Sequence, residues 1–595
     1  MTAKYSAPLA DLRFALHDVL GVDELFKRLP GFEESTRDVV DAVLDEAAKF
    51  TEHVLAPLNQ SGDVEGCQFD PATASVKTPA GFKAAYAHYV ENGWAGLTSP
   101  TAFGGQAMPQ TLGAAVKEML DSANLSWGNY PLLSHGATEA LLQHGEDWQR
   151  EAFLKPIVAG RWTGTMCLTE PHCGTDLGLL KTKAEPAQDG SYRISGTKIF
   201  ITAGEHDLTE NIVHLVLARL PDAPAGVKGI SLFVVPKFKV GRDGALGERN
   251  ALACGAIEHK MGIRASATCT MNFDGADGYL VGQPNKGLAA MFTMMNTARL
   301  AVGLQGLSLI ERAYQNSLAY ARERLQMRAL TGAKFPEKPA DPLIVQPDIR
   351  RMLLTQKAFA EGGRVLALYA YTQEDIAKHS PDAAERERAE AIVSFLTPIV
   401  KALLTESANE CTYHALQIFG GHGYIVEHGM EQFARDARIT TLYEGTTQIQ
   451  ALDLLGRKVL QFQGVGLKHF LLEISAFCEK HAEDAALGEF IAPLAAATKA
   501  WSEITMDVAR RAATSPEEMG AAAYDYLFFS GYVALAYCWA RSVATAQSSR
   551  PDIAEAKTQT ARFYFARVLP RIGTHAGAIR AGASTLLDMP DASFG

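Results

Sequence analysis

The sequence lacks the short motifs by which several common classes of enzyme are recognised. It has no CxxC, HxxxH or HExxH pattern, so the neighbouring His414, His422 and His428 give little support for a zinc site. It also has no P-loop, no GxSxG motif and no GxGxxG motif after a strand. We therefore expect no bound metal and no Rossmann-type crevice for a dinucleotide.

Cysteine is scarce and scattered. The eight cysteines form no closely spaced pair of ligands and are Cys67, Cys167, Cys173, Cys254, Cys269, Cys411, Cys478 and Cys538. This distribution is typical of reduced thiols in a cytosolic protein rather than of disulfides. The expected location is therefore the cytoplasm.

Long apolar runs, a secretory leader and an excess of positive charge are also missing. The longest apolar run, Tyr526–Ala540, is shorter than the ~20 residues that span a bilayer. A buried helix is the favoured interpretation of this run, and an interfacial helix is the alternative. The N-terminus has an early acid and no apolar core, so no secretory signal is expected. The net charge of −11 argues against nucleic acid as a partner, although it leaves room for a local basic groove.

At 595 residues the chain is too long for a single hydrophobic core, and the spacing of its apolar residues changes along its length. Helical spacing of apolar residues predicts a mostly helical N-terminal domain over 1–163. Short alternating runs separated by Gly and Pro predict a compact antiparallel β-domain over 164–280. Helical patterning returns in a bundle domain over 281–460, interrupted by a proline-rich loop at Thr331–Pro342, and in an alanine-rich extension over 461–595. The predicted fold class is therefore α+β, mostly α.

Four separated segments carry the candidate chemistry: Met166–Asp176, Gly196–Thr202, Gln417–Tyr424 and Leu442–Gln450. A glycine-rich turn followed by one carboxylate at the start of a helix is what a flavin enzyme needs to remove a carbon-bound proton. In order and spacing these segments resemble the acyl-CoA dehydrogenase family, and the chain is identified as a member. The resemblance covers about residues 40–460, and the extra C-terminal helical domain marks the longer branch of the family.

Glu444 is the candidate catalytic base. Removing the α-proton of an acyl thioester needs a base beside Cα, donors around the thioester oxygen and a hydride acceptor beside Cβ. Thr447–Gln450 has the pattern of a capping box, which predicts that an amphipathic helix opens at Thr447, directly after Glu444 and its turn. The alternative is that Glu444 is a solvated loop acid.

The resemblance implies an FAD-dependent enzyme of fatty acid β-oxidation that converts an acyl-CoA into a trans-2-enoyl-CoA. Glu444 would be the α-proton base and the flavin N5 the hydride acceptor. Electron-transferring flavoprotein would then accept the electrons. The C-terminal extension would cover a surface that shorter tetrameric relatives use for pairing, which favours a homodimer. Two substrate classes are compatible with the residues: medium- to long-chain fatty acyl-CoAs and 3-methylthiopropionyl-CoA.

The resemblance also assigns residues to the two ligands. Flavin contacts are implied for Met166, Leu168, Thr169, Gly174, Thr175, Phe200, Thr202, Arg324, Gln417, Gly420, Gly421, Thr446 and Gln448. Substrate contacts are implied for Thr175, Asn296, Arg299, Tyr443 and Gly445. Trp127–Leu133 falls where family members line the pocket for the acyl tail.

Several of these assignments have a purely structural alternative. Arg324 could be an exposed arginine at a helix end, Phe200 a core aromatic of a strand, and Trp127–Leu133 a packed helix. Cys173 and Leu179 depart from the family pattern, which prefers very small residues at these positions. Gln432 departs from it as well, because it stands where a basic residue is preferred.

Two other functions compete with the dehydrogenase. An acyl-CoA oxidase or a related flavin oxidase would use the same residues, since nothing in the sequence fixes access of oxygen. A catalytically silent homologue would serve as an assembly or binding protein. Glu444 and the complete set of flavin residues argue against this second alternative.

Overall fold

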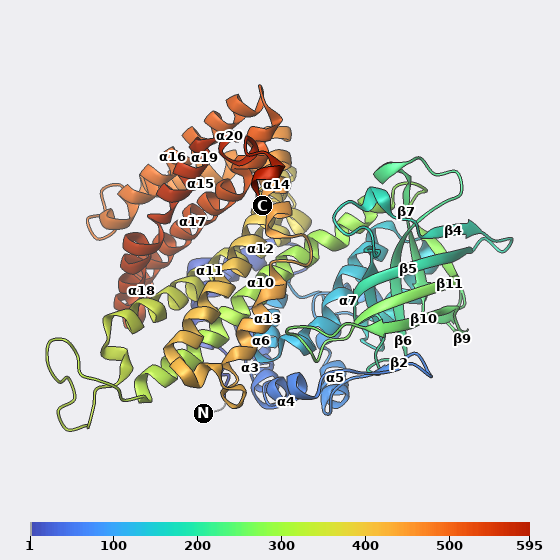
Figure 1. Cartoon of the computed structure of the whole chain (residues 1–595), viewed down its shortest axis with the longest axis horizontal. Coiled ribbons are helices and arrows are strands. Elements are labelled where there is room, and N and C mark those ends of the chain that lie inside the picture. Colours follow the sequence, from blue (N-terminus) through green and yellow to red (C-terminus); the bar gives the residue numbers. More distant parts are fainter. Residues whose placement is uncertain (1–2) are drawn as a thin grey trace. The chain divides into compact units, whose positions relative to one another are not determined.

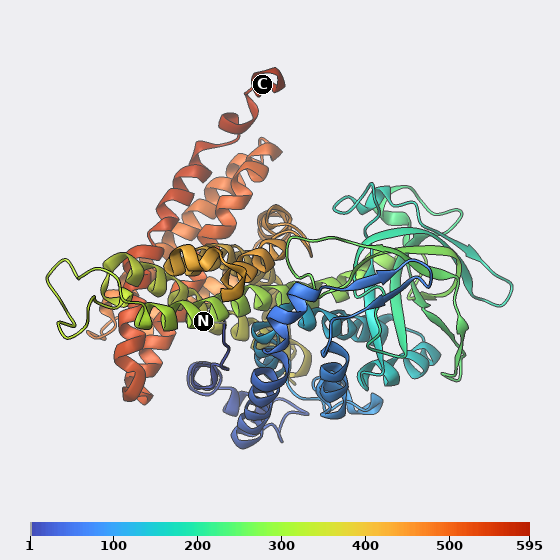
Figure 2. The same ribbon diagram turned by 60° about the horizontal axis from the view of Figure 1, so that its bottom comes forward.

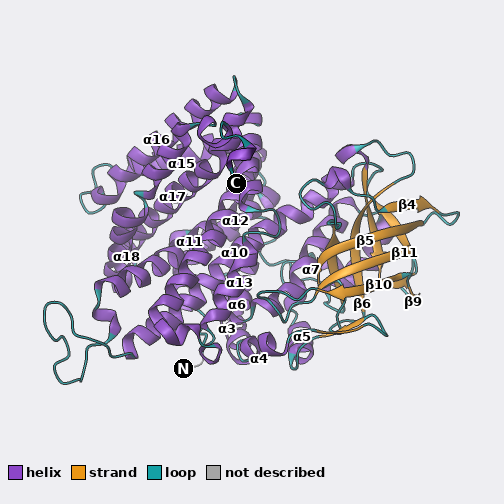
Figure 3. Ribbon diagram, viewed as in Figure 1, coloured by secondary structure: helices purple, strands orange, loops and turns teal. Residues whose placement is uncertain are grey.

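A computed structural model describes residues 3–595 and divides the chain into two compact units. The first unit, which we call the helical unit, comprises Met1–Ala48, Pro109–Ser122 and Val302–Gly595. The second, which we call the β unit, comprises Lys49–Met108 and Ala123–Ala301. The strands of the described chain all fall in the β unit (Figure 3).

The helical unit is built from helices that the chain supplies from both ends. Its helices, some of which continue across a unit boundary, are α1 (Leu9–Arg13), α2 (Val22–Arg28), α3 (Arg37–Phe50), α6 (Gln110–Ala123), α10 (Gly287–Glu323), α11 (Pro347–His379), α12 (Ala383–Phe419), α13 (Met430–Thr440), α14 (Thr447–Leu452), α15 (Val465–Lys480), α16 (Gly488–Ala512), α17 (Pro516–Ser549), α18 (Pro551–Phe563), α19 (Arg571–Ala581) and α20 (Ser584–Leu587). The predicted return of helical structure after residue 281 is confirmed, and the extension is helical as expected (Figure 1).

Two long apolar helices are largely buried in the helical unit. By length and composition, the helix spanning Ala383–Tyr424 could cross a membrane, but 83% of its apolar window is buried inside the protein. Burial of this kind is what a core helix requires. The run Tyr526–Ala540 lies in α17 and is buried along its length, which confirms the prediction of a buried helix. Gly362 of α11 permits close packing there, since a Cβ at this position would meet the indole Nε1 of Trp539 at 2.5 Å.

The proline-rich loop Thr331–Pro342 projects from the helical unit between α10 and α11 (Figure 2). It is held by Asp341, whose carboxylate accepts hydrogen bonds from the backbone N–H groups of Ala329 (2.9 Å), Lys334 and Phe335. Burial by itself would raise the pKa of Asp341, but these N–H donors and Arg328 lower it to about 2. The loop is therefore closed by one buried carboxylate rather than by helix or strand.

The β unit contains a seven-stranded sheet flanked by helices. Its strands are β3 (Trp162–Cys167), β4 (Lys183–Pro186), β5 (Tyr192–Thr202), β6 (Asn211–Arg219), β7 (Ile230–Pro236), β10 (Leu252–Ile257) and β11 (Thr268–Val281). Two hairpins, β1–β2 (Gln68–Asp70, Ser75–Lys77) and β8–β9 (Phe238–Val240, Leu246–Arg249), stand apart from it. The accompanying helices are α4 (Leu58–Glu65), α5 (Phe82–Glu91), α7 (Leu125–His144), α8 (Asp147–Gln149) and α9 (Lys155–Val158).

Most strands of the sheet run antiparallel, and the sheet closes on itself. Strand β7 pairs with both β11 and β6, so β11, β5, β4, β6 and β7 form a ring of pairings. Strands β3 and β6 are parallel, because the chain returns to β6 through β4 and β5 rather than through a hairpin. On β11, the side chains of Cys269, Met271 and Phe273 are buried on one face, as the alternation predicts.

Candidate active site

Glu444 lies on a turn between α13 and α14 of the helical unit. Its backbone has φ of 56° and that of Gly445 has φ of 89°, so two consecutive residues are left-handed. A glycine adopts this conformation readily, whereas a glutamate in it is strained unless its surroundings hold it there. The Glu444 side chain is half-buried rather than fully solvated.

The helix after this turn begins at Thr447, and the residue that caps it is Thr446. The Thr446 side chain accepts a hydrogen bond from the N–H of Ile449 at 3.4 Å. The predicted start of the helix at Thr447 is therefore confirmed, whereas the predicted capping box is wrong because the N-cap is Thr446. Instead, the Thr447 hydroxyl donates to Glu406 Oε1 at 2.5 Å.

Two residues without a predicted site role contact the backbone of this turn: Lys401, which lies outside every motif, and Gln450, which the motif includes only as a capping residue. Lys401 Nζ donates to the carbonyl of Gly445 at 2.8 Å. Gln450 Nε2 donates to the carbonyls of Glu444 at 3.0 Å and Gly445 at 3.3 Å. A signal for Lys401 is present in the sequence, because it is the one charged residue in the apolar stretch Ile399–Leu404 of α12.

Tyr443, a predicted substrate residue, directs its hydroxyl to a neighbour in the same unit. The phenol donates to Gln305 Oε1 on α10. Burial, followed by the nearby Asp121 and Glu444 carboxylates, raises the pKa of Tyr443 well above its ordinary value. Tyr443 is therefore a neutral donor that fixes the start of the turn.

The glycine-rich segment and Arg324 lie close to one end of α10. Helix α12 ends at Phe419, whose ring stacks on Tyr320 of α10 with centroids 4.0 Å apart. The Tyr320 hydroxyl also pairs with His422 Nδ1 at 2.8 Å. Arg324 follows one turn after Tyr320, directly beyond the end of α10, and its side chain is exposed. The structure therefore brings Arg324 and the segment around Gly420 to one region of the helical unit.

The surface of this segment is open. Gln417, Gly420 and Gly421 are exposed, as is Gln448 on α14. Added Cβ atoms at Gly420 and Gly421 would meet nothing within 4 Å. Packing within the chain therefore does not explain a glycine at position 421, although the φ of 58° at Gly420 favours glycine there.

In the β unit, the predicted flavin loop after β3 is anchored by a buried ion pair. Glu170 accepts from Lys198 Nζ at 2.9 Å, and it also accepts from the N–H groups of Lys181 (2.7 Å) and Thr182 (3.0 Å). Burial opposes the charge on Glu170, but Lys198 and these donors lower its pKa to about 2. Burial lowers the pKa of Lys198, and Glu170 offsets part of that effect.

The predicted flavin residues of this loop divide into buried and exposed groups. Met166 and Leu168 contribute their side chains to the hydrophobic core, so only their backbone is available to a ligand. Thr169 is half-buried, and its carbonyl accepts from the N–H of Ile199 at 2.9 Å. Gly174 and Thr175 are exposed.

Phe200 is exposed because a bulge reverses the side-chain alternation of β5. Lys198 is buried, so a regular strand would also bury Phe200, two residues later. The pairing with β11 instead shifts between Lys198 and Ile201, and Phe200 adopts φ of 59°. The ring is consequently 59% exposed, which rules out the core alternative, and Thr202 is half-buried nearby.

The remaining predicted residues of the β unit lie on α10 and α7. Asn296 is exposed, whereas Arg299 is buried. Trp127 and Tyr130 of α7 are fully buried, and the Tyr130 hydroxyl donates to the carbonyl of Ala265 at 3.0 Å. The alternative given for Trp127–Leu133, a packed helix, therefore accounts for the rings of Trp127 and Tyr130.

All eight cysteines are free thiols, as expected. Among the described residues, Glu170, His172 and Cys173 have ligand-type atoms within 4.8 Å of one another. The Glu170 oxygens already accept from Lys198, Lys181 and Thr182, and burial raises the pKa of the Cys173 thiol. The contacts of this group are therefore those that hold the loop after β3 in place.

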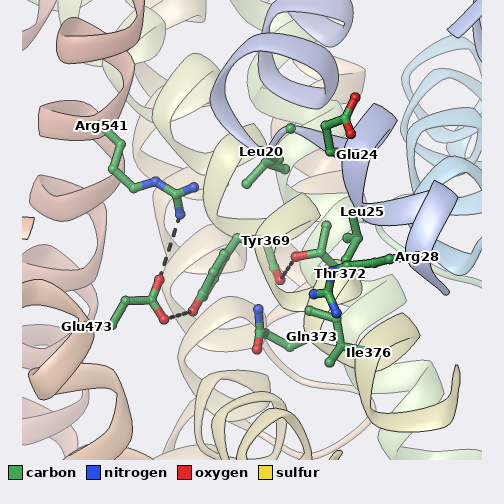
Figure 4. A pocket seen from close by; sticks show the side chains of 11 residues that line it. Leu20, Glu24, Leu25, Arg28, Tyr369, Thr372, Gln373, Ile376, Glu473 and Arg541 are labelled. Atoms are coloured by element: carbon green, nitrogen blue, oxygen red, sulfur yellow. Dashed lines mark hydrogen bonds and ion pairs between the residues drawn. The ribbon is translucent and has the colours of Figure 1, made fainter. Parts of the chain in front are cut away.

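Cavities formed by the described residues include ones of about 330, 480 and 430 Å³, whose linings contain none of the predicted site residues. The first lies in the helical unit among α2, α11, α15 and α17 (Figure 4). There Glu473 accepts from the Tyr369 hydroxyl at 2.7 Å and faces Arg541 at 4.0 Å. Glu473 and Arg541 therefore pair with each other, whereas Glu24 and Arg28 of the lining pair with Lys27 and Glu385.

Four family models match successive parts of the chain. The N-terminal, middle and C-terminal domains of acyl-CoA dehydrogenase match residues 38–161, 165–276 and 285–460. A further model, described as acetyl-CoA dehydrogenase C-terminal like, matches residues 470–590.

Similar proteins extend over almost the whole chain. A 3-methylmercaptopropionyl-CoA dehydrogenase of Ruegeria pomeroyi is 43% identical, covering 95% of this chain and 96% of the relative. A broad-specificity linear acyl-CoA dehydrogenase of Mycobacterium tuberculosis is 34% identical, covering 99% of this chain and 100% of the relative. In fold, the chain is similar to an acyl-CoA dehydrogenase of Bacillus anthracis solved with FAD, with a TM-score of 0.73 and 18% identity over 93% of this chain and 90% of the other.

Proposed function

Because the chain belongs to the acyl-CoA dehydrogenase family, we propose that it removes the α- and β-hydrogens of an acyl-CoA thioester and releases a trans-2-enoyl-CoA. Glu444 takes the α-proton, and by family resemblance its backbone N–H helps to hold the thioester oxygen. Bound FAD would supply the acceptor for the β-hydrogen and its electron pair at N5. The observation that carries the proposal is a half-buried carboxylate on a turn whose carbonyls are held by Lys401 and Gln450.

The chemistry of the exposed residues fits FAD. Arg324 presents a guanidinium suited to a pyrophosphate, and Phe200 presents an exposed ring to an aromatic system. Gly420 and Gly421 leave open space in which a ligand can approach the backbone. The remaining proposed flavin contacts are Met166, Leu168, Thr169, Gly174, Thr175, Thr202, Gln417, Thr446 and Gln448.

Substrate contacts are proposed for Thr175, Asn296, Arg299, Tyr443 and Gly445. The relative with 43% identity favours 3-methylmercaptopropionyl-CoA as the substrate, and the relative with broad specificity favours linear acyl-CoAs. We place the sulfur-containing thioester first, since the identity is higher at similar coverage. A panel of acyl-CoAs of different length, with and without the thioether, ranks the candidates by kcat/KM in an anaerobic dye-reduction assay.

The assignment of Glu444 is tested with Glu444→Gln, which keeps the size of the side chain and removes its basicity. We expect FAD to remain bound and turnover to be lost. Glu503→Gln, which changes an exposed acid of α16, is the matched control and should retain full turnover. Full turnover in Glu444→Gln would show that another group is the base, and a wild-type protein that takes up no FAD would contradict the enzyme assignment.

The electron acceptor is proposed to be an electron-transferring flavoprotein rather than oxygen. Reduced enzyme should then transfer its electrons to this partner faster than it forms hydrogen peroxide. Rapid stoichiometric peroxide formation in air would instead identify an oxidase. The proposed location is the cytoplasm.

A homodimer is proposed, and the exposed apolar residues beside the glycine-rich turn are suited to pairing. The side chains of Tyr424, Ile425 and Val426 are 82%, 44% and 52% exposed. Sedimentation velocity should give the mass of two chains. Replacing Tyr424 and Val426 by Ser should produce monomers, whereas a tetrameric wild type would contradict the proposal.

A further inference from the structure

The backbone that carries Glu444 does not hold its shape through its own sequence alone. Gly445 tolerates a left-handed conformation, but Glu444, with φ of 56°, does not favour it. Neighbouring groups must therefore keep this residue in place, and the structure identifies those that contact the backbone of Glu444 and Gly445.

Lys401 is the first of these groups. It lies on α12 between buried apolar neighbours, and its side chain is fully buried. A buried ammonium is costly unless it is well hydrogen-bonded, so a lysine at this position is a poor choice for packing alone. Its Nζ is 2.8 Å from the carbonyl oxygen of Gly445, which makes a charge-assisted hydrogen bond to the turn.

Gln450 is the second group, and its orientation shows which contacts matter. Its Nε2 donates to the carbonyls of both Glu444 and Gly445, while its Oε1 is buried and meets no partner in the described residues. Rotating the amide would place the Oε1 oxygen against two carbonyl oxygens. The side chain therefore gives up one hydrogen bond of its own to keep both turn carbonyls paired.

The two donors and the glycine fit one another closely. A Cβ at position 445 would lie 2.6 Å from Gln450 Nε2, so a larger residue would displace the amide from the turn. The carbonyls of Glu444 and Gly445 are thus held from two different helices, α12 and α14. This arrangement leaves the backbone of Glu444 little freedom to relax to an ordinary conformation.

We propose that Lys401 and Gln450 are positioning residues that hold the left-handed Glu444–Gly445 turn and so fix the direction of the Glu444 carboxylate. This inference rests on the proposed function, in which Glu444 is the base. It assigns no direct contact with substrate to either residue. Their effect on turnover is exerted through the geometry of proton abstraction, for which small displacements are costly.

The main test is Lys401→Met, which keeps a side chain of similar length and removes its donors. We expect kcat to fall by about 100-fold while KM and the bound FAD are retained. The isotope effect on kcat with α-deuterated acyl-CoA should rise, because proton abstraction becomes more strongly rate-limiting. Lys401→Arg, which can still donate to Gly445, should recover part of the lost kcat. Gln450→Met should show the same pattern, and it provides the test if Lys401→Met does not fold.

Lys557→Met is the matched control. Lys557 is another buried lysine of the helical unit, and it pairs with Asp11 and with Glu361 at 2.8 Å. This variant should lower the thermal unfolding midpoint without changing the isotope effect, which separates positioning from general stability. Unchanged kcat and isotope effect in folded Lys401→Met and Gln450→Met would overturn the inference, and lost turnover in Glu444→Gln would show that the proposed function still holds. Full turnover in Glu444→Gln would overturn both.

Discussion

Phe200 combines an exposed side chain with a backbone conformation that few non-glycine residues adopt. The side chain is exposed and the backbone is left-handed, so the position stabilises the apo protein little. Sequence patterning predicted a strand here and offered both a core and a flavin role for the ring. It could not decide between them, because the bulge that turns Phe200 outward arises from the pairing of β5 with β11, which no local pattern records.

Phe200→Ala should therefore change ligand binding more than stability. We expect the free energy of unfolding of the apo protein to change by about 0.5 kcal/mol or less, and the Kd for FAD to rise. Phe233→Ala, at a fully buried ring of β7, is the control and should lose about 3–5 kcal/mol. Denaturant unfolding and flavin titration measure the two effects, and a large loss of stability in Phe200→Ala would contradict an exposed role.

Lys198→Met should show how far the loop after β3 depends on the ion pair of Glu170. Leaving a buried carboxylate without its cation typically costs about 3–5 kcal/mol. In the wild type, the pKa of Glu170 is about 2, below its ordinary value, so its stabilising contribution is present above about pH 4.5 and is lost as the pH falls through about 2. Without Lys198, the loss should begin at higher pH. Acid unfolding followed by circular dichroism would detect this shift, and an unchanged acid midpoint would contradict it.

Helix starts illustrate what can be predicted at the scale of elements. The order of helices and strands, the loop at Thr331–Pro342 and the buried α17 follow from apolar spacing and from Gly and Pro. Some helix starts, however, depend on side chains that lie far away in the sequence. Helix α6 begins at Gln110, and its first N–H groups are satisfied by Asp375, which lies on α11. The shift of the N-cap to Thr446 has a similar cause, because Glu406 of α12 and the turn carbonyls take the groups that a local capping box would use.

Asp375→Asn should change how the free energy of unfolding depends on pH, because Asp375 accepts hydrogen bonds from the first residues of α6. Asp375 accepts from the N–H of Gln110 at 2.8 Å and from the N–H and hydroxyl of Thr111 at 3.0 and 2.6 Å. Burial raises its pKa to about 7, although these donors oppose the shift. Since the folded pKa lies above the ordinary value of 3.8, this group lowers stability progressively as the pH rises from about 4 to 7.

The asparagine variant cannot ionise, so it should lack this slope, and it should be less stable than wild type at pH 4, where it loses one acceptor. Denaturant unfolding at pH 4, 6 and 8 measures both effects. Thr505→Val, which changes a partner of the buried Tyr526 hydroxyl far along the chain, serves as a control that should leave the slope unchanged. Parallel pH profiles for wild type and Asp375→Asn would contradict the assigned ionisation.

At the scale of the whole molecule, compact units and sequence segments do not coincide. The helical unit gathers Met1–Ala48, Pro109–Ser122 and Val302–Gly595, whereas the family models follow the chain in four successive blocks. The predicted domain boundaries at 163, 280 and 460 stay a prediction. Local patterns identify elements, but the grouping of elements depends on contacts between residues hundreds of positions apart. The contact of Arg364 with Glu118, 246 positions away, is one example.

Arg364 connects three of these distant segments inside the helical unit. Its fully buried guanidinium pairs with Asp11 of α1, Glu118 of α6 and Glu311 of α10. Burial would lower the pKa of this arginine, but the three carboxylates raise it further above its ordinary value, so it stays charged. No sequence pattern predicted this cluster, because each member lies in a helix with an ordinary pattern.

Arg364→Met should leave three carboxylates without their shared cation, with a cost of about 3–5 kcal/mol in the free energy of unfolding at pH 7. Burial already raises the pKa of Glu118 to about 6 against the opposing charge of Arg364, and removing that charge should raise it further. An acid with a raised folded pKa lowers stability as the pH increases, so the loss should be larger at pH 8 than at pH 5.

Adding Glu118→Gln and Glu311→Gln to the arginine variant should restore part of the stability by removing uncompensated buried charge. Denaturant unfolding at both pH values measures these differences. If the triple variant were less stable than Arg364→Met alone, the carboxylates would have to be neutral or otherwise compensated, and charge pairing would not be what joins these three segments.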